Sequence, residues 1–304
     1  MSDLITFQNQ YPFLVSGIAF TVGAVLGSFL NVVAHRLPKM MQREWHGQAI
    51  TIIEELDGDA SLSQRLRQSL DKNSQPFNLA APSSSCPNCG ALIQPLHNIP
   101  ILSWFMLRGR CSDCSKKISP RYPSVEFAAA TLTMLVIMQY GVTFQGIAAC
   151  GLTWALITLA LIDFDTQLLP DDITLLFLWL GLTANFFGLF VPLEESLLGA
   201  IAGYLSLWTI YQLFKLITGK EGMGFGDFKM LAMLGAWLGL SAIPLIILVS
   251  SFFGAALGSL LILLGRSREK PIPYGPFLAI AGWIALMWKA DLVALYLDLT
   301  IRNV

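Results

Sequence analysis

The sequence predicts an all-α polytopic membrane protein with about eight transmembrane helices and one large polar segment. Three observations predict this class. Hydrophobic residues make up 55% of the 304-residue chain and charged residues only 13%, where a soluble domain has about 25% charged residues. The mean hydropathy is +0.62. The apolar residues are gathered into runs close to the roughly 20 residues that a helix needs to cross a bilayer.

Eight apolar runs follow one another along the chain. The predicted spans are Pro12–Val33, Val125–Tyr140, Ile147–Ile162, Ile173–Val191, Leu197–Leu216, Met230–Ile243, Leu245–Leu264 and Phe277–Leu297. The sixth is short and rich in glycine, and Pro244 divides it from the seventh. We therefore expect a first span (1–34), a polar domain (35–122) and a seven-helix membrane core (123–304). The first run is too long for a signal-peptide core and no basic residue precedes it, so we expect it to be retained.

Basic residues predict the orientation of the spans. Eleven of the 19 lysines and arginines lie between His35 and Tyr122. They are Arg36, Lys39, Arg43, Arg65, Arg67, Lys72, Arg108, Arg110, Lys116, Lys117 and Arg121. Because cytoplasmic loops collect Lys and Arg, we expect this segment in the cytoplasm and both chain ends in the periplasm, although Lys289 and Arg302 fit less well. The net charge of -1 and the lack of a basic patch give no nucleic-acid footprint.

Four cysteines in the polar domain form two CxxC motifs. Cys86 and Cys89 belong to CPNC, and Cys111 and Cys114 belong to CSDC. Two such knuckles can complete a tetrahedral thiolate shell, and a closed shell of this kind indicates a structural zinc ion. Gly90 can take the positive φ that the knuckle turn needs. Disulfides are the alternative, but a cytoplasmic location keeps thiols reduced. The fifth cysteine, at position 150 inside the third span, is explained by packing.

Two aspartates stand at the ends of apolar runs. Asp163 ends the run GLTWALITLALID, and Asp227 begins another within GFGDFK. An ionisable side chain at membrane depth is costly and therefore marks a functional site by default. On the predicted topology, both lie at the cytoplasmic face. Asp165, Asp171 and Asp172 are explained as loop charges or helix caps, and for Asp227 taken alone an N-cap role stays an equal alternative.

Taken together, Asp163 and Asp227 predict acid–base chemistry. Two carboxyl groups at the edge of a bilayer cannot both ionise cheaply, so we expect them to share one proton within about 4–6 Å. One carboxylate can then take a proton from water while its protonated partner polarises a carbonyl, as in aspartic proteases. Two other classes stay open. Intramembrane carboxylates also mark transporters and channels, and the cysteine-rich domain could dock a non-enzymatic assembly protein.

The polar segment from Gln42 to Ser85 carries no recognisable chemistry. TIIEEL (51–56) and LSQRLRQSL (62–70) predict short amphipathic helices. PFNLAAPSSS (76–85) has the composition of a linker.

Four segments resemble the bacterial type IV prepilin peptidases, the leader peptidase/N-methyltransferases of the GxGD aspartic protease class. GSFLNVVAHRLP (27–38) is similar to the family signature at the end of the first span. The stretch from Cys86 to Glu126 resembles the zinc-binding loop. LIDFDTQLLPD and GFGDFK resemble the segments with the two catalytic aspartates, here Asp163 and Asp227.

The resemblance implies an inner-membrane enzyme with two activities. It would cleave the basic leader from prepilins of type IV pili and pseudopilins of type II secretion at the cytoplasmic face. It would then methylate the new N-terminal amine with S-adenosylmethionine. No Rossmann-type glycine loop is found for that cofactor, and the methyl-transfer site rests on analogy. Candidate residues for it are Asn31, His35, Arg108, Arg110 and Glu126. Arg36 and Arg121 are expected to be interfacial anchors, with Glu126 paired to one of them.

Overall fold

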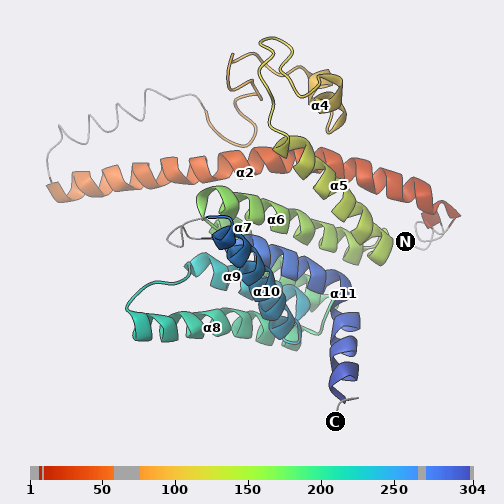
Figure 1. Ribbon diagram of the computed structural model, residues 1–304, viewed down its shortest axis with the longest axis vertical. Helices are drawn as coiled ribbons and strands as arrows, with labels where there is room; N and C mark the ends of the chain where they lie inside the picture. Colours follow the sequence, from red (N-terminus) through yellow and green to blue (C-terminus); the bar gives the residue numbers. More distant parts are fainter. Residues whose placement is uncertain (1–6, 9, 58–75, 266–271, 302–304) are drawn as a thin grey trace. The chain divides into compact units, whose positions relative to one another are not determined.

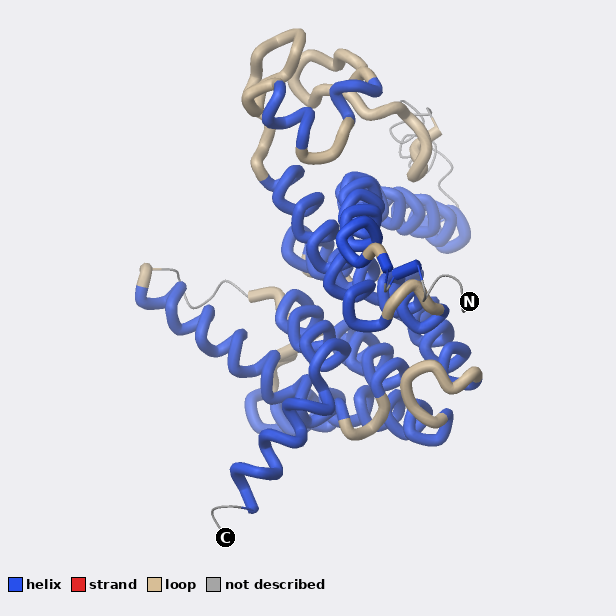
Figure 2. The backbone as a smooth tube through the Cα atoms, turned by 90° about the vertical axis from the view of Figure 1, so that its right-hand side faces the viewer, coloured by secondary structure: helices blue, strands red, loops and turns tan. Residues whose placement is uncertain are grey.

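The computed structural model describes residues 7–8, 10–57, 76–265 and 272–301 (Figure 1). It divides into two compact units, residues 1–23 with 129–304, and residues 24–128. Every regular element of the described residues is a helix (Figure 2). Eight longer helices are α2 (Pro12–Asp57), α5 (Arg121–Tyr140), α6 (Phe144–Thr166), α7 (Asp171–Phe186), α8 (Leu193–Thr218), α9 (Phe225–Leu238), α10 (Ala242–Leu263) and α11 (Gly275–Ile301). Two short elements, η1 (Pro95–Asn98) and α4 (Leu102–Met106), lie between the CxxC motifs.

Each predicted span coincides with one of the longer helices. Five of them, α2, α6, α8, α10 and α11, are long and apolar enough to cross a membrane. The predicted class, an all-α multi-pass membrane protein, is therefore confirmed. The α7 and α9 helices, with 16 and 14 residues, are shorter than the roughly 20 residues of a full span.

Two predicted boundaries were wrong. The first span was expected to end at Val33, but α2 continues through Pro38 to Asp57 and includes the predicted TIIEEL helix. Pro244 does not divide the sixth span from the seventh, because α9 already ends at Leu238 and Gly239 has a φ of +81°. Pro244 lies in the first turn of α10, where its missing N–H would have had no helical partner. The predicted helix at 62–70 lies outside the described residues.

The short helix α9 forms the centre of the membrane core. It contacts α7, α8, α10 and α11, and nearly all its residues from Asp227 to Leu238 are buried. It approaches α8 backbone to backbone at Gly199 and Gly235. A Cβ atom added to Gly235 would lie 2.1 Å from the carbonyl oxygen of Gly199. Small residues allow this kind of close contact between membrane helices, where dispersion replaces the hydrophobic effect as the attraction.

Side chains from other helices satisfy the carbonyl groups at the C-terminal end of α9. Asn185 donates to the carbonyls of Ala236 at 2.8 Å and Trp237 at 3.1 Å, and Ser196 also donates to Ala236. Lys289 of α11 donates to the carbonyl of Leu238 at 2.8 Å. A helix that ends inside an apolar layer needs such partners because water cannot reach its last carbonyls. Lys289, which fitted the predicted topology less well, therefore caps the C-terminus of α9.

We predict that Gly235→Leu destabilises the membrane core. The new side chain has no room against α8, and overpacking of this kind costs about 1–3 kcal/mol or more. The measurement is the midpoint of thermal unfolding of the purified protein in detergent. Gly17→Ala is the matched control, because a Cβ at Gly17 meets nothing within 4 Å. An unchanged midpoint for Gly235→Leu would contradict the close α8–α9 contact.

Candidate active site

Three acidic side chains are buried among the described residues, namely Glu126, Asp163 and Asp227. The last two belong to the membrane core and are 5% and 8% exposed. Asp163 lies in the last turn of α6, and Asp227 lies in the first turn of α9. The charge of Asp163 acts on the Asp227 carboxyl. The two aspartates singled out in the sequence therefore form one buried acidic site.

The N-terminus of α11 holds the Asp163 carboxylate. The backbone N–H of Gly275 donates to its Oδ2 at 2.8 Å. A Cβ added to Gly275 would lie 2.7 Å from the same oxygen, so a larger residue would displace the carboxylate. Sequence reasoning missed Gly275. Its signal was the Pro-Tyr-Gly-Pro stretch before the last span, since Gly–Pro pairs mark turns and helix starts.

Contacts between the two aspartate segments fix their separation. Gly226 packs against Leu169 of the segment that follows Asp163, and an added Cβ would lie 2.7 Å from the Leu169 Cβ. The Lys229 ammonium, two residues after Asp227, lies 2.7 Å from both carboxylate oxygens of Asp171. Gly226 is therefore required for close packing of these segments.

The N-cap of α9 is Gly224, which excludes the alternative that Asp227 is only the N-cap. Asp171 and Asp172 do lie in the first turn of α7, as expected, but the N-cap there is Pro170 and no side chain caps the helix. Asp171 and Asp172 therefore stabilise α7 through their negative charge near the positive end of the helix dipole, and not through a capping hydrogen bond. Asp165 is exposed.

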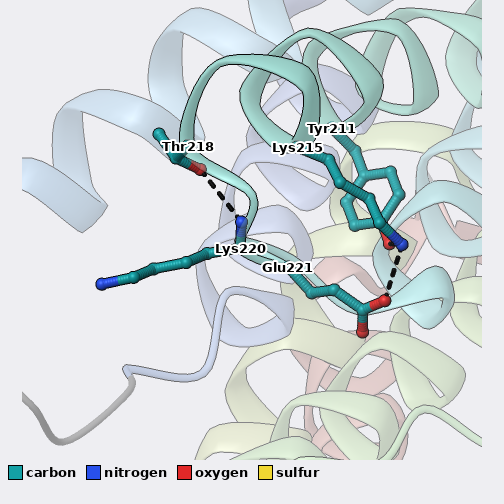
Figure 3. Close-up of polar contacts among 5 residues, drawn as sticks. All are labelled: Tyr211, Lys215, Thr218, Lys220 and Glu221. Atoms are coloured by element: carbon teal, nitrogen blue, oxygen red, sulfur yellow. Dashed lines mark hydrogen bonds and ion pairs between the residues drawn. The ribbon is translucent and has the colours of Figure 1, made fainter.

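The loop that leads into α9 is tied to α8 (Figure 3). Lys215 donates to Glu221 at 2.8 Å and to the Tyr211 hydroxyl at 3.3 Å. This hydrogen bond from Lys215 lowers the pKa of the Glu221 carboxyl. The buried Tyr211 ring packs against Phe225 and Phe228, with both centroids 5.6 Å away. The residues on either side of Asp227 are thereby held by an aromatic cluster.

The four cysteines of the two knuckles come together. Their sulfur atoms all lie within 4.8 Å of one another, and those of Cys86 and Cys114 are 3.8 Å apart. Tetrahedral thiolates at about 2.3 Å from a metal ion are spaced by about 3.8 Å, whereas a disulfide needs about 2.05 Å. All of these cysteines are free thiols, so the cluster fits a metal ion and the disulfide alternative does not hold.

The two knuckles share one backbone design. Each is closed by an antiparallel bridge, Ser85 with Leu92 and Arg110 with Lys117. In the first knuckle Gly90 has the expected positive φ, +72°. Ser115, at φ +58°, takes the corresponding place in the second knuckle. Backbone N–H groups of Cys89 and Asn88 lower the pKa of the Cys86 thiol to about 6, whereas desolvation and the neighbouring thiols raise the pKa of Cys89 to about 12.

Arg36 is not an interfacial anchor, contrary to expectation. It is buried, and its guanidinium donates to the carbonyls of Asn78, Leu79 and Pro82 at 3.0, 3.3 and 2.6 Å. Its charge thus holds the segment that was expected to be a linker. The Glu126 carboxylate accepts from the backbone N–H of Ile101 at 2.7 Å, and the guanidinium of Arg36, one of its two expected partners, is bonded to backbone carbonyls instead.

The other candidates for methyl transfer lie in the same unit of the chain. Asn31 donates to the carbonyls of Gly27 and Tyr122, both at 3.3 Å. His35 lies 2.8 Å from the Lys39 ammonium. Arg108 and Arg110 line an open groove of about 450 Å³ beside the second knuckle.

Comparison with known proteins matches both halves of this arrangement. Residues 21–140, with the four cysteines, match the Bacterial Peptidase A24 N-terminal domain. Residues 150–259, with both buried aspartates, match the Type IV leader peptidase family. The chain belongs to this family.

Close relatives extend over almost the whole chain. A protein of Stutzerimonas stutzeri named prepilin leader peptidase/N-methyltransferase is 49% identical over 97% of this chain and 98% of its own length. Proteins of the same name from Pseudomonas aeruginosa and Aeromonas hydrophila are 48% and 47% identical, with coverage of 97% and 98% of this chain and 98% and 99% of their own. No solved structure matches the chain.

We predict that the purified protein carries one metal ion per chain in the cysteine cluster. Cys111→Ser should lower the metal content because three thiolates bind a soft divalent ion far more weakly than four. Elemental analysis of the purified protein measures this. Cys150→Ala is the control, since Cys150 is buried in α6 and is not one of the four clustered cysteines. Equal metal content in Cys111→Ser and the wild type would contradict the assignment.

Proposed function

We propose that this protein cleaves the leader peptides of prepilins and pseudopilins with Asp163 and Asp227, and then methylates the new N-terminal residue with S-adenosylmethionine. The burial of two interacting carboxyl groups at one end of the core helices carries the peptidase part of the proposal. The names of relatives that are 47–49% identical over nearly their full length support both activities.

Hydrolysis requires one carboxylate and one carboxylic acid, and a buried pair that shares a proton supplies both. The carboxylate takes a proton from a water molecule, whose oxygen adds to the scissile carbonyl carbon. The protonated partner donates a hydrogen bond to the carbonyl oxygen. When the tetrahedral intermediate breaks the C–N bond, the leaving amine receives a proton from the pair. No covalent bond to the protein forms.

The position of the pair suits a substrate that is part helix and part leader. Asp163 lies near the C-terminus of α6, whereas Asp227 and Gly275 lie near the N-termini of α9 and α11. All three residues are therefore at the same end of the helix bundle. On the positive-inside rule this end faces the cytoplasm. The apolar helix of a pilin precursor would lie in the bilayer beside the core, with its leader on the cytoplasmic side. This arrangement also speaks against a transporter, whose site would lie near the midplane.

The metal of the cysteine cluster is proposed to be zinc, held by Cys86, Cys89, Cys111 and Cys114. A four-thiolate shell leaves no open coordination position, so the ion would stabilise the fold of the polar domain and take no part in hydrolysis. Methyl transfer needs a bound sulfonium cofactor that supplies an electrophilic methyl group to a neutral amine. The described residues contain no strand and hence no strand–loop–helix nucleotide site; Asn31, His35, Arg108, Arg110 and Glu126 stay the candidates.

We predict that Asp163→Asn and Asp227→Asn each lower the cleavage rate by about 10²–10⁴-fold, the usual contribution of a general acid or base. Asn keeps the size of the side chain and removes the titratable proton. The assay is cleavage of a prepilin in membranes that contain each variant. Asp172→Asn, on an exposed residue of the α7 first turn, should cleave normally. Both dyad variants should still methylate a pre-cleaved pilin. Cleavage by either variant would remove that aspartate from the catalytic pair.

The two glycines of the GFGD motif should differ in their tolerance. Gly226→Ala forces Leu169 to shift and should lower cleavage about 10²-fold, the cost of a displacement near 1 Å at a catalytic group. Gly224→Ala should retain activity, because its Cβ would meet only the Asp227 carboxylate, at 3.9 Å. The ratio of the two kcat values measures this difference. Similar losses for both variants would mean that the motif serves backbone flexibility instead.

A further inference from the structure

The stretch between the two knuckles exposes an unusual number of large apolar side chains. Leu96, Leu102, Phe105 and Met106 are 72%, 61%, 65% and 77% exposed, and Leu92 is 69% exposed. None of them lies in a predicted span. Exposed apolar side chains gathered in one short stretch mark a surface that binds something. We call residues 92–106 the inter-knuckle segment.

Three hydrogen bonds place this segment along the helices that enter the bilayer. Asn31 of α2 donates to the carbonyl of Tyr122 at the start of α5. One turn further along α5, the Glu126 carboxylate bonds to the Ser28 hydroxyl and to the N–H of Ile101. Ile101 immediately precedes α4.

These contacts give the depth of α4. Glu126 lies five residues after the start of α5 at Arg121, which is about 7.5 Å along the helix axis. Its partner on α2, Ser28, lies inside the predicted span Pro12–Val33. The N-terminus of α4 is therefore level with the part of α2 inside the predicted span rather than with the extension of α2 beyond Val33.

The contact between Ile101 and Glu126 holds the start of α4 in one defined backbone conformation. Ile101 has a φ of +62°, and a β-branched residue with positive φ is a steric outlier. Such a conformation persists only where the surroundings impose it. The bond from its N–H to the buried Glu126 carboxylate, at 2.7 Å, is the contact that holds it. The segment is thus tied to α5 and not merely resting against it.

Positive charge follows directly after the apolar side chains. Residues 86–121 contain five lysines and arginines and one aspartate, Asp113. Exposed Arg108, Arg110 and Lys117 line the groove beside Trp104. Apolar side chains next to tryptophan and clustered cations are the pattern of elements that lie in the membrane interface and contact anionic lipids.

We propose that the inter-knuckle segment is inserted into the cytoplasmic leaflet, with Leu102, Phe105 and Met106 among the acyl chains and anionic phospholipid headgroups in the Arg108–Arg110–Lys117 groove. The polar domain is then a membrane-bound domain with a second point of attachment besides α2 and α5. A basic leader peptide does not fit the same groove, because the four neighbouring cations Arg108, Arg110, Lys116 and Lys117 would repel it.

Photocrosslinking from single positions tests this placement. p-Benzoylphenylalanine replaces Phe105 or Met106 in the full-length protein, reconstituted in nanodiscs of phosphatidylethanolamine and phosphatidylglycerol. The matched control carries it at Gln48, an exposed residue of α2 about 22 Å beyond the predicted span. Mass spectrometry counts the lipid adducts after irradiation. Metal content and prepilin cleavage are measured on the same samples.

The expected result is several-fold more lipid adduct at Phe105 and Met106 than at Gln48, with unchanged metal content. Triple substitution of Arg108, Arg110 and Lys117 by alanine should lower the share of phosphatidylglycerol in the adducts. Equal adduct at all three positions, or adducts to an added prepilin in place of lipid, would overturn the proposal. If the variant labelled at Phe105 loses its metal, the lipid adducts of variants labelled at Met106 and Leu96 are compared with those at Gln48 instead. Loss of adduct with intact cleavage would refute this inference alone and leave the proposed function standing.

Discussion

A helix too short to cross the membrane must have its backbone ends satisfied by protein, and this constraint organises the core around α9. With 14 residues, α9 is about 21 Å long, against an apolar layer of about 30 Å. At its C-terminal end, Asn185, Ser196 and Lys289 bind the last carbonyls. At its N-terminal end α9 carries the buried Asp227. The close packing of Gly199 against Gly235 holds the C-terminal half of α9 against α8.

The acidic site depends on three segments that are distant in the sequence. Asp163 ends one helix and Asp227 begins another, and the contact of Gly226 with Leu169 sets how near the two segments come. Gly275, the first residue of α11, directs a backbone N–H at Asp163. Each of these contacts requires the absence of a side chain. Preorganisation of the two carboxyl groups therefore rests on backbone geometry, which is more rigid than a network of long side chains.

Features that depend on local pattern could be predicted from the sequence. The apolar runs located the helices, and the CxxC spacing located the cysteine cluster. The two aspartates stood out because carboxylates are rare beside such runs. Features that depend on tertiary contacts could not. The Pro-Tyr-Gly-Pro stretch indicates a turn at Gly275, but nothing local shows that its N–H binds Asp163. Nothing local marks Arg36 as the residue whose guanidinium binds the carbonyls of residues 78–82. The end of α9 was misplaced because Pro244 is equally compatible with a helix break and with a first turn, and only the positive φ of Gly239 decides between them.

Helix α11 contacts both the Asp163 carboxylate and the C-terminal end of α9. Its first residue binds Asp163, and Lys289 binds the last carbonyl of α9. A kink at Trp288, with φ -134°, lies between these two contacts. The straight stretch from Gly275 to Met287 therefore carries only the contact with Asp163, and the cap on α9 belongs to the part that begins at the kink. Because the kink separates the two contacts, tilting the stretch before it would move the Gly275 N–H relative to Asp163 while Lys289 still binds the Leu238 carbonyl. The geometry around Asp163 can therefore change without loss of the cap at the other end of α9.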